Sequence, residues 1–171
     1  DSVANVVSDP TMHPDDAQRI NLDQARSKGL ELSLEYLLAN DLTIELKGLI
    51  VDTEVRSCPE NTDLVGNRFA QAPKHRSTAT FLWTPSPLEF RLDVRHESNR
   101  YDDALNNRLL EDAFALDLSL AHNLSDNARL RLSVNNLTDA EIQTGLSSES
   151  SGGIISTGSP RNFLLGLNWS F

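Results

Sequence analysis

The sequence is poor in cysteine, in clustered basic residues and in long apolar runs, and each shortage excludes a class of protein. Its one cysteine, Cys58, excludes an intrachain disulfide and a cysteine-rich zinc site. The 15 lysines and arginines are scattered among 25 acidic residues, for a net charge of -10. This balance excludes a nucleic-acid partner, because phosphate binding needs clustered bases. No run reaches the roughly 20 apolar residues of a membrane-spanning helix.

The start of the chain also lacks the usual signals. It opens on Asp1-Ser2-Val3, with neither an initiator methionine nor a basic-then-apolar signal segment. We therefore expect a fragment or an excised domain of a longer protein. A membrane-spanning β-strand is compatible with this composition, because it needs only about 9–11 residues with every second one apolar.

The positive signal is alternation of apolar and polar residues with a period of two. In the last segment, Phe163, Leu165, Leu167, Trp169 and Phe171 fall on one side, and polar or small residues fall mostly on the other. A strand with two different faces requires this period, and a helix cannot satisfy it. The same pattern recurs over residues 30–36, 42–50, 88–94, 114–120 and 130–134. With further strands near 3–7 and 75–84, we predict about eight strands.

The connections between these segments alternate between short and long. Tight turns are predicted at Asn40-Asp41, Pro85-Ser86-Pro87 and Ser125-Asp126-Asn127. The longer polar links cover residues 9–18, 58–74, 99–111 and 147–159. Short turns at one rim and long loops at the other are typical of bacterial outer-membrane barrels, whose short turns are periplasmic. The sequence thus predicts an all-β, antiparallel up-and-down transmembrane β-barrel segment.

Aromatic residues lie beside the predicted short turns, on the apolar face. Tyr36 precedes the first turn, Trp83 and Phe90 flank the second, and Trp169 and Phe171 end the chain. A periplasmic aromatic girdle has this placement. The alternative is a soluble antiparallel sandwich, whose strands also alternate. A sandwich should have fewer long strands and no systematic placement of aromatics.

Several motifs, in order along nearly the whole chain, resemble those of one family. They are Asn21 to Leu32, with its Gly29-Leu30-Glu31 run; Leu64 to His75, ending in Pro73-Lys74-His75; Arg100-Tyr101-Asp102-Asp103 with Asn106; Asn135 to Ala140; and Gly158-Ser159-Pro160-Arg161 with Gly166 and Phe171. Together they resemble the late barrel strands of the TonB-dependent outer-membrane receptors. This family imports ferric siderophores, cobalamin, haem and some glycans.

The resemblance implies a part of a larger protein. Members of the family have a barrel of about 22 strands with a plug inside, and nothing in residues 1–171 is similar to the plug or to the TonB box. We therefore expect residues 1–171 to be the C-terminal portion of the barrel. The resemblance also implies that Trp169 and Phe171 form the signal that the barrel-assembly machinery reads.

The expected function is TonB-dependent import, across the bacterial outer membrane, of a scarce nutrient such as a ferric siderophore or cobalamin. The partners implied are outer-membrane lipid, the barrel-assembly machinery, the small-molecule nutrient, and the TonB complex through the missing plug. No cofactor and no enzyme activity are expected. The alternative is a small self-contained eight-stranded outer-membrane barrel with a structural or adhesive role.

Ligand contacts in such a receptor would come from the outer loops and the plug apex, and the candidates in residues 1–171 are Arg68, Arg100 and Tyr101. The polar faces carry Arg91, Arg95, Arg129 and Arg131 interspersed with Asp93 and Asp117. A wall of mixed charge would hydrogen-bond a plug or solvate a channel.

No metal site is predicted. The four histidines, His13, His75, His96 and His122, are far apart and lack metal-ligand spacing; His96 is expected on the apolar side near the outer rim. Asp15-Asp16 and Asp102-Asp103 could hold calcium, but calcium loops space their oxygen ligands more widely, around a glycine. The serines of 147–159 have no nucleophile motif, which favours an outer loop.

Overall fold

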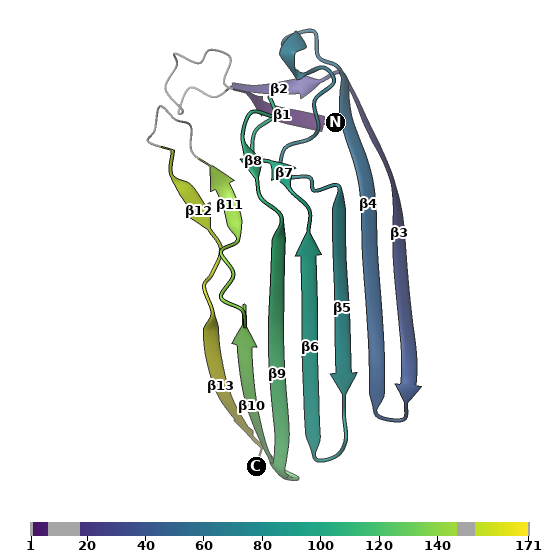
Figure 1. Cartoon of the computed structure of the whole chain (residues 1–171), viewed down its shortest axis with the longest axis vertical. Coiled ribbons are helices and arrows are strands. Elements are labelled where there is room, and N and C mark those ends of the chain that lie inside the picture. The colour runs from purple at the N-terminus through teal and green to yellow at the C-terminus, as the bar shows by residue number, and fades with distance from the viewer. Residues whose placement is uncertain (1, 7–17, 147–152, 171) are drawn as a thin grey trace.

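The computed structural model describes residues 2–6, 18–146 and 153–170, and its main element is one antiparallel sheet of seven strands. These strands stand side by side in Figure 1, with short turns at one end. No helix in the described part of the chain is long and apolar enough to cross a membrane. The seven strands are β3 (Gln24–Ala39), β4 (Leu42–Ser57), β5 (His75–Trp83), β6 (Leu88–Glu97), β9 (Ala113–Ser125), β10 (Ala128–Asn135) and β13 (Asn162–Trp169).

The topology is up-and-down. The order across the sheet is β13-β10-β9-β6-β5-β4-β3, so each strand lies beside its neighbours along the chain, and every pairing is antiparallel. Seven of the predicted strands and all three predicted tight turns are confirmed. Within the described residues the sheet does not close, because β3 and β13 are its two edges. The arrangement is therefore a partial barrel and not a self-contained eight-stranded one.

The predicted long links contain regular structure that the sequence pattern did not show. Three two-stranded ribbons lie at the end opposite the short turns (Figure 1). The predicted first strand belongs to one of them rather than to the main sheet, and a short 3-10 helix, η2 (Thr62–Leu64), lies between β4 and β5. The ribbons are β1 (Ser2–Val6) with β2 (Gln18–Leu22), β7 (Arg100–Tyr101) with β8 (Leu109–Leu110), and β11 (Gln143–Leu146) with β12 (Ile155–Thr157).

The register aligns the alternating residues into rows that cross the sheet. Tyr36 pairs with Ile44, Ile44 with Phe81, and Phe81 with Leu92. Since one step of register would move a side chain to the other face, this alignment gathers the apolar side chains on one face. The opposite face carries the charged residues that alternate with them, such as Glu45 and Asp93.

The apolar face is uncovered. Leu30 is 69% exposed, Leu32 64% and Leu165 69%, because no second layer lies on them in the described structure. A soluble sandwich would bury these leucines between two sheets, so that alternative is wrong.

The turn ends of the hairpins are staggered. Leu42, the first residue of β4, pairs with Trp83, the last of β5, whereas Leu88 at the start of β6 pairs with His122 and β9 continues to Ser125. Each later hairpin along the chain thus extends further beyond the turn of the hairpin before it. Strands that tilt relative to a barrel axis have such a stagger.

Gly29 provides a test of the close contact between β3 and β4. A Cβ added at Gly29 would lie 2.5 Å from the Ile50 carbonyl oxygen, a backbone atom that cannot move aside alone. We expect Gly29→Ala to lower the free energy of unfolding by about 1–3 kcal/mol, measured by urea titration of the folded protein. Gly48→Ala is the matched control, since nothing lies within 4 Å of its added Cβ. Equal stability of the two variants would contradict this contact.

Candidate functional site

The three predicted ligand-binding residues converge in the loop layer at the end of the sheet opposite the short turns. Arg68 lies in the link after η2, and Arg100 and Tyr101 form β7. The guanidinium carbon of Arg68 lies 5.7 Å from the centroid of the Tyr101 ring, within the range of a cation–π contact. The Gln71 backbone N–H donates to the Tyr101 carbonyl at 2.6 Å. Residues more than 30 positions apart in the sequence therefore form one cluster.

Arg100 is the most buried member, at 8% exposure. Its Nε donates to the Gln71 side-chain oxygen at 2.9 Å, its Nη2 donates to the Gln143 carbonyl at 3.1 Å, and its Nη1 lies 3.6 Å from Glu97. It thereby joins the loop before β5, the end of β6 and the start of β11. In this structure Arg100 fastens loops together, and a ligand contact from it stays a prediction.

The acidic pair beside Tyr101 is also engaged by the protein. The Asp102 carboxylate accepts from the Leu146 backbone N–H at 2.9 Å and from the Gln71 side-chain amide, and it lies 3.7 Å from Arg108 Nε. The Asp103 carboxylate accepts from the backbone N–H of Arg108 at 2.7 Å, which stabilises the turn between β7 and β8. Both carboxylates hold loop structure. Within the described residues, no group of three or more metal-ligating side chains forms.

A small hydrophobic core lies beneath the loops. Val55, Cys58 and Leu64 are buried together, and Phe69 and Leu105 pack against them. Val55 is on the same face of β4 as the polar side chains of the sheet, so the loops fold over that side. The core therefore fixes the loop that carries Arg68 against the loop after β7. Sequence reasoning missed it, since its members come from separate segments without a shared period.

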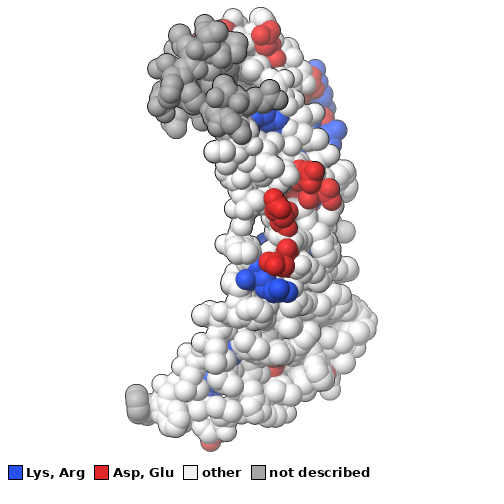
Figure 2. Space-filling view, turned by 60° about the vertical axis from the view of Figure 1, so that its left-hand side comes forward, with Lys and Arg blue, Asp and Glu red and all other residues white. Residues whose placement is uncertain are grey.

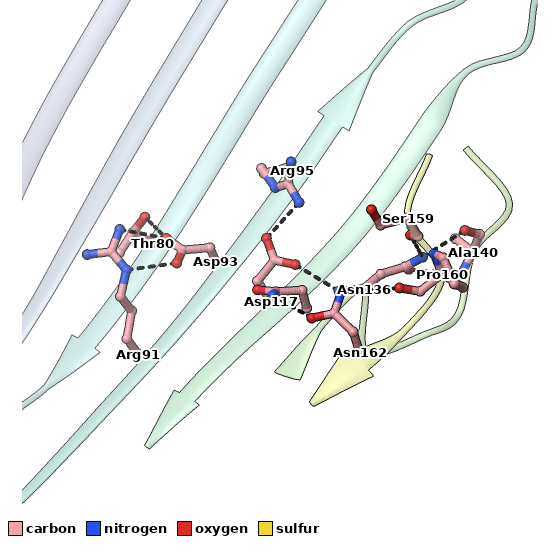
Figure 3. A network of polar contacts seen from close by, with 11 residues as sticks. Thr80, Arg91, Asp93, Arg95, Asp117, Asn136, Ala140, Ser159, Pro160 and Asn162 are labelled. Carbon is pink, nitrogen blue, oxygen red and sulfur yellow. Dashed lines mark hydrogen bonds and ion pairs between the residues drawn. The ribbon is translucent and has the colours of Figure 1, made fainter. Parts of the chain in front are cut away.

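The polar face of the sheet is held by ion pairs. Arg91 Nε and Nη2 donate to the two Asp93 oxygens at 2.7 and 2.9 Å, and the Thr80 hydroxyl donates to Asp93 at 2.5 Å. Arg95 donates to Asp117 at 2.6 Å on the next strand. These contacts are drawn in Figure 3. Figure 2 shows acidic and basic side chains together near the middle of the molecule, with further charged side chains toward its top and its lower end.

A second ion pair on this face reaches over a whole strand. Arg129 of β10 donates to Glu89 of β6 at 2.7 Å, and Arg131 lies 3.9 Å from the same carboxylate. Between them, Ala121 of β9 pairs with both Glu89 and Arg131 and is buried. Its short side chain leaves room for the arginines to reach across. Glu89 was not singled out as a partner in the sequence, because this contact requires the strand order.

The Asn135–Ala140 motif forms a structural junction around Asn136. This buried residue has a φ of 51°, in the left-handed region that asparagine tolerates. Its backbone N–H donates to Asp117 at 2.9 Å, and its side-chain amide donates to the carbonyls of Ala140 at 2.9 Å and Ser159 at 3.3 Å (Figure 3). The junction joins β9, the turn after β10 and the segment before β13.

The aromatic residues predicted for the girdle lie on the apolar face near the short turns. Trp83 pairs with Phe90 across the β5–β6 hairpin, and Tyr36 lies near the end of β3. The indole N–H of Trp83 donates to the Asp41 carboxylate at 3.0 Å, so the turn residue orients the ring. Their position at a membrane boundary stays a prediction.

The predicted assembly signal lies at the end of β13. Trp169 is exposed on the apolar face and pairs with Ala128. Phe171 lies outside the described residues. A role of this strand end in assembly stays a prediction.

Comparisons with known proteins agree on one family. The model of the "TonB dependent receptor-like, beta-barrel" family matches residues 1–137. No curated protein matches the sequence.

Solved structures of receptors share the fold. The siderophore receptor PiuA from Acinetobacter baumannii has a TM-score of 0.72 at 20% identity, over 85% of this chain and 22% of that one. The ferric yersiniabactin uptake receptor FyuA from Yersinia pestis has a TM-score of 0.70 at 22% identity, over 84% and 23%. BauA, the ferric preacinetobactin receptor from Acinetobacter baumannii, has a TM-score of 0.72 at 18% identity, over 99% and 25%. The chain thus spans about a quarter of the length of these proteins, and at these identities the likeness establishes the fold.

Arg100 provides a test of the loop arrangement. We expect Arg100→Ala to release β11 from the loop before β5, because the bonds to Gln71 and Gln143 are lost. Amide hydrogen exchange in residues 143–146 should become about tenfold faster, the size expected for losing a charge-assisted hydrogen bond. Arg161→Ala is the control, since this exposed arginine bonds elsewhere, to the Leu137 carbonyl at 3.4 Å. Unchanged exchange in Arg100→Ala would show that β11 is held by other contacts.

Proposed function

The chain belongs to the TonB-dependent receptor-like β-barrel family, and from this premise we propose that it forms the C-terminal wall of a larger outer-membrane barrel. In the proposed role the whole receptor imports a scarce nutrient, such as a ferric siderophore or cobalamin. Residues 1–171 contribute wall, outer loops and the assembly signal. The family and the structures named above are receptors, and the proposed role is transport without catalysis.

The observation that carries the proposal is the uncovered apolar face. Apolar patches of more than a few hundred Å² are rare on soluble monomers, because water is a poor solvent for them. Here exposed leucines continue through the sheet, from Leu30 in β3 to Leu165 in β13. Lipid tails are the solvent that such a face matches. A strand of about nine residues tilted by about 45° crosses roughly 21 Å, close to the apolar band of outer-membrane barrels.

Charged pairs on the same face support a boundary at the loop end. Beyond Leu30 and Ile50, the exterior positions of β3 and β4 become Lys28 opposite Asp52, and Arg26 opposite Glu54. Arg26 Nη2 donates to Glu54 at 2.7 Å. A change from leucines to ion pairs within a few residues fits the passage of a strand from hydrocarbon into the headgroup region.

The polar face supports an inner partner. The charged side chains along β6 and β9, such as Arg91, Arg95 and Asp117, would face water or the plug in a larger barrel. The plug is the proposed link to the TonB complex. Trp169 and Phe171 are the proposed signal for the barrel-assembly machinery.

The lipid-facing side is tested by placing one arginine on each face. Leu34 lies in the middle of the exposed run of β3, and Ser33 next to it lies on the opposite face. We expect Leu34→Arg to lower the free energy of unfolding of the full-length protein in lipid vesicles by about 2–4 kcal/mol, the cost of a basic side chain at the bilayer midplane. Ser33→Arg should cost little, since its side chain points to the polar interior. Equal losses would contradict the proposed orientation.

Import is tested with the full-length protein in cells that lack other receptors. Uptake of radiolabelled ferric siderophores and cobalamin is measured in the presence and absence of TonB. We expect uptake of at least one compound, and its loss without TonB. Recovery of the protein in the soluble fraction, or equal uptake without TonB, would overturn the proposed function.

The outer-loop cluster is tested by ligand affinity. For the imported compound, Arg68→Ala with Tyr101→Ala should raise the Kd about tenfold, because a charge-assisted hydrogen bond and a ring contact are lost. Arg56→Ala is the control, since Arg56 pairs with Glu54 at 3.0 Å on the exterior face. An unchanged Kd in the double variant would remove these residues from the ligand site without affecting the proposed transport role.

A further inference from the structure

The apolar face contains a shallow groove on the side toward the outer loops. Its volume is about 400 Å³, within the range of small-molecule sites. It is centred on one row of the register, in which Leu32, Gly48, Ser77, His96 and Phe114 pair in succession across five strands. The row confirms that His96 lies on the apolar face.

Small residues create the groove. Gly48 and Ser77 occupy the middle of the row, and Ala79 follows Ser77 on the same face of β5. Nothing lies within 4 Å of a Cβ added at Gly48, so the glycine is not required by packing and leaves open space. The rows that border the groove carry larger side chains, Ile50 toward the loops and Phe81 toward the short turns, beyond the row of Ala79. The groove is therefore a local depression in an otherwise bulky apolar surface.

The groove is polar at one end only. Ser77 and His96 supply a hydroxyl and an imidazole in the row nearer the outer loops. The next row toward the short turns is hydrocarbon, with Leu46, Ala79 and Val94. Beyond the polar end, the next row pairs Leu30 with Ile50 and Ile50 with His75, and the exterior face then reaches the charged positions Asp52 and Arg26. A molecule that fits this gradient has a polar head toward the outer rim and an apolar tail toward the middle of the sheet.

We propose that this groove binds the acyl chain of an outer-leaflet membrane lipid, with the lipid headgroup beside Ser77 and His96. This inference rests on the proposed function, since it requires the apolar face to lie in the membrane. A lipid fits better than a protein partner, because a stable protein interface needs about 800 Å² per side, whereas the groove covers only a few side chains. Lipid tails are equally apolar everywhere around the sheet, so apolarity alone would not retain a lipid in the groove. Close packing in the groove and hydrogen bonds to Ser77 and His96 would retain it.

The test uses a photoreactive phospholipid and a pair of glycine variants. The full-length protein is reconstituted in vesicles of phosphatidylglycerol with a diazirine in the acyl chain, illuminated, and analysed by peptide mass spectrometry. Gly48→Leu fills the groove. Gly166→Leu is the matched control, because it adds the same side chain in equally open space on the polar face of β13. Ala79→Phe is a second filling variant.

We expect labelling to concentrate on the β4 and β5 peptides that line the groove in the wild type and in Gly166→Leu. In Gly48→Leu and Ala79→Phe it should fall about tenfold, the size expected from packing and one or two hydrogen bonds in a membrane. Equal labelling of all four proteins, each inserted in the vesicles, would overturn the groove assignment and leave the proposed function standing. A wild type that fails to insert would overturn both. Native mass spectra in which the wild type is a dimer and Gly48→Leu a monomer would identify a second copy as the occupant and overturn the lipid.

Discussion

A sheet with a single layer must satisfy two environments at once, and every other feature of this molecule depends on that constraint. Successive side chains of a strand point to opposite faces, so the apolar and polar residues of β3 to β13 separate without a second layer to receive either set. Backbone N–H and C=O groups are paired between neighbouring strands, which is the only way a sheet can lie in hydrocarbon. One strand register therefore places the exposed leucines on one face and brings the ion-paired side chains together on the other.

Buried apolar packing occurs elsewhere, in the loop layer. The cluster of Val55, Cys58 and Leu64 is a conventional hydrophobic core, although it lies outside the regular part of the sheet. It gives Arg68 and Tyr101 a fixed position, and the hydrogen bonds of Arg100 and Asp102 extend that order to β11. Binding loops need a rigid support. Here the small core within the loop layer supplies that support, rather than the strands of the sheet.

The sequence predicted the strands, the tight turns and the two faces, because all three follow from periodicity and turn chemistry within a few residues. It did not predict contacts that depend on strand order, such as Glu89 with Arg129 across β9, or the row from Leu32 to Phe114. The ribbons were missed since they are short and lack a sustained period. Asn106, Asn136 and Asp139 adopt positive φ angles, and asparagine followed by turn residues was the available signal for the junction around Asn136.

The pairing of each strand with its neighbour along the chain has a consequence for folding. Such contacts close loops within one hairpin, so less chain entropy is lost than in pairings between distant strands before each new pair of strands forms its hydrogen bonds. The sheet can lengthen one hairpin at a time, from any hairpin outward. At every stage the edge strand presents the same row of unpaired backbone N–H and C=O groups. Adding the last hairpin therefore forms the same kind of hydrogen bonds as adding the first.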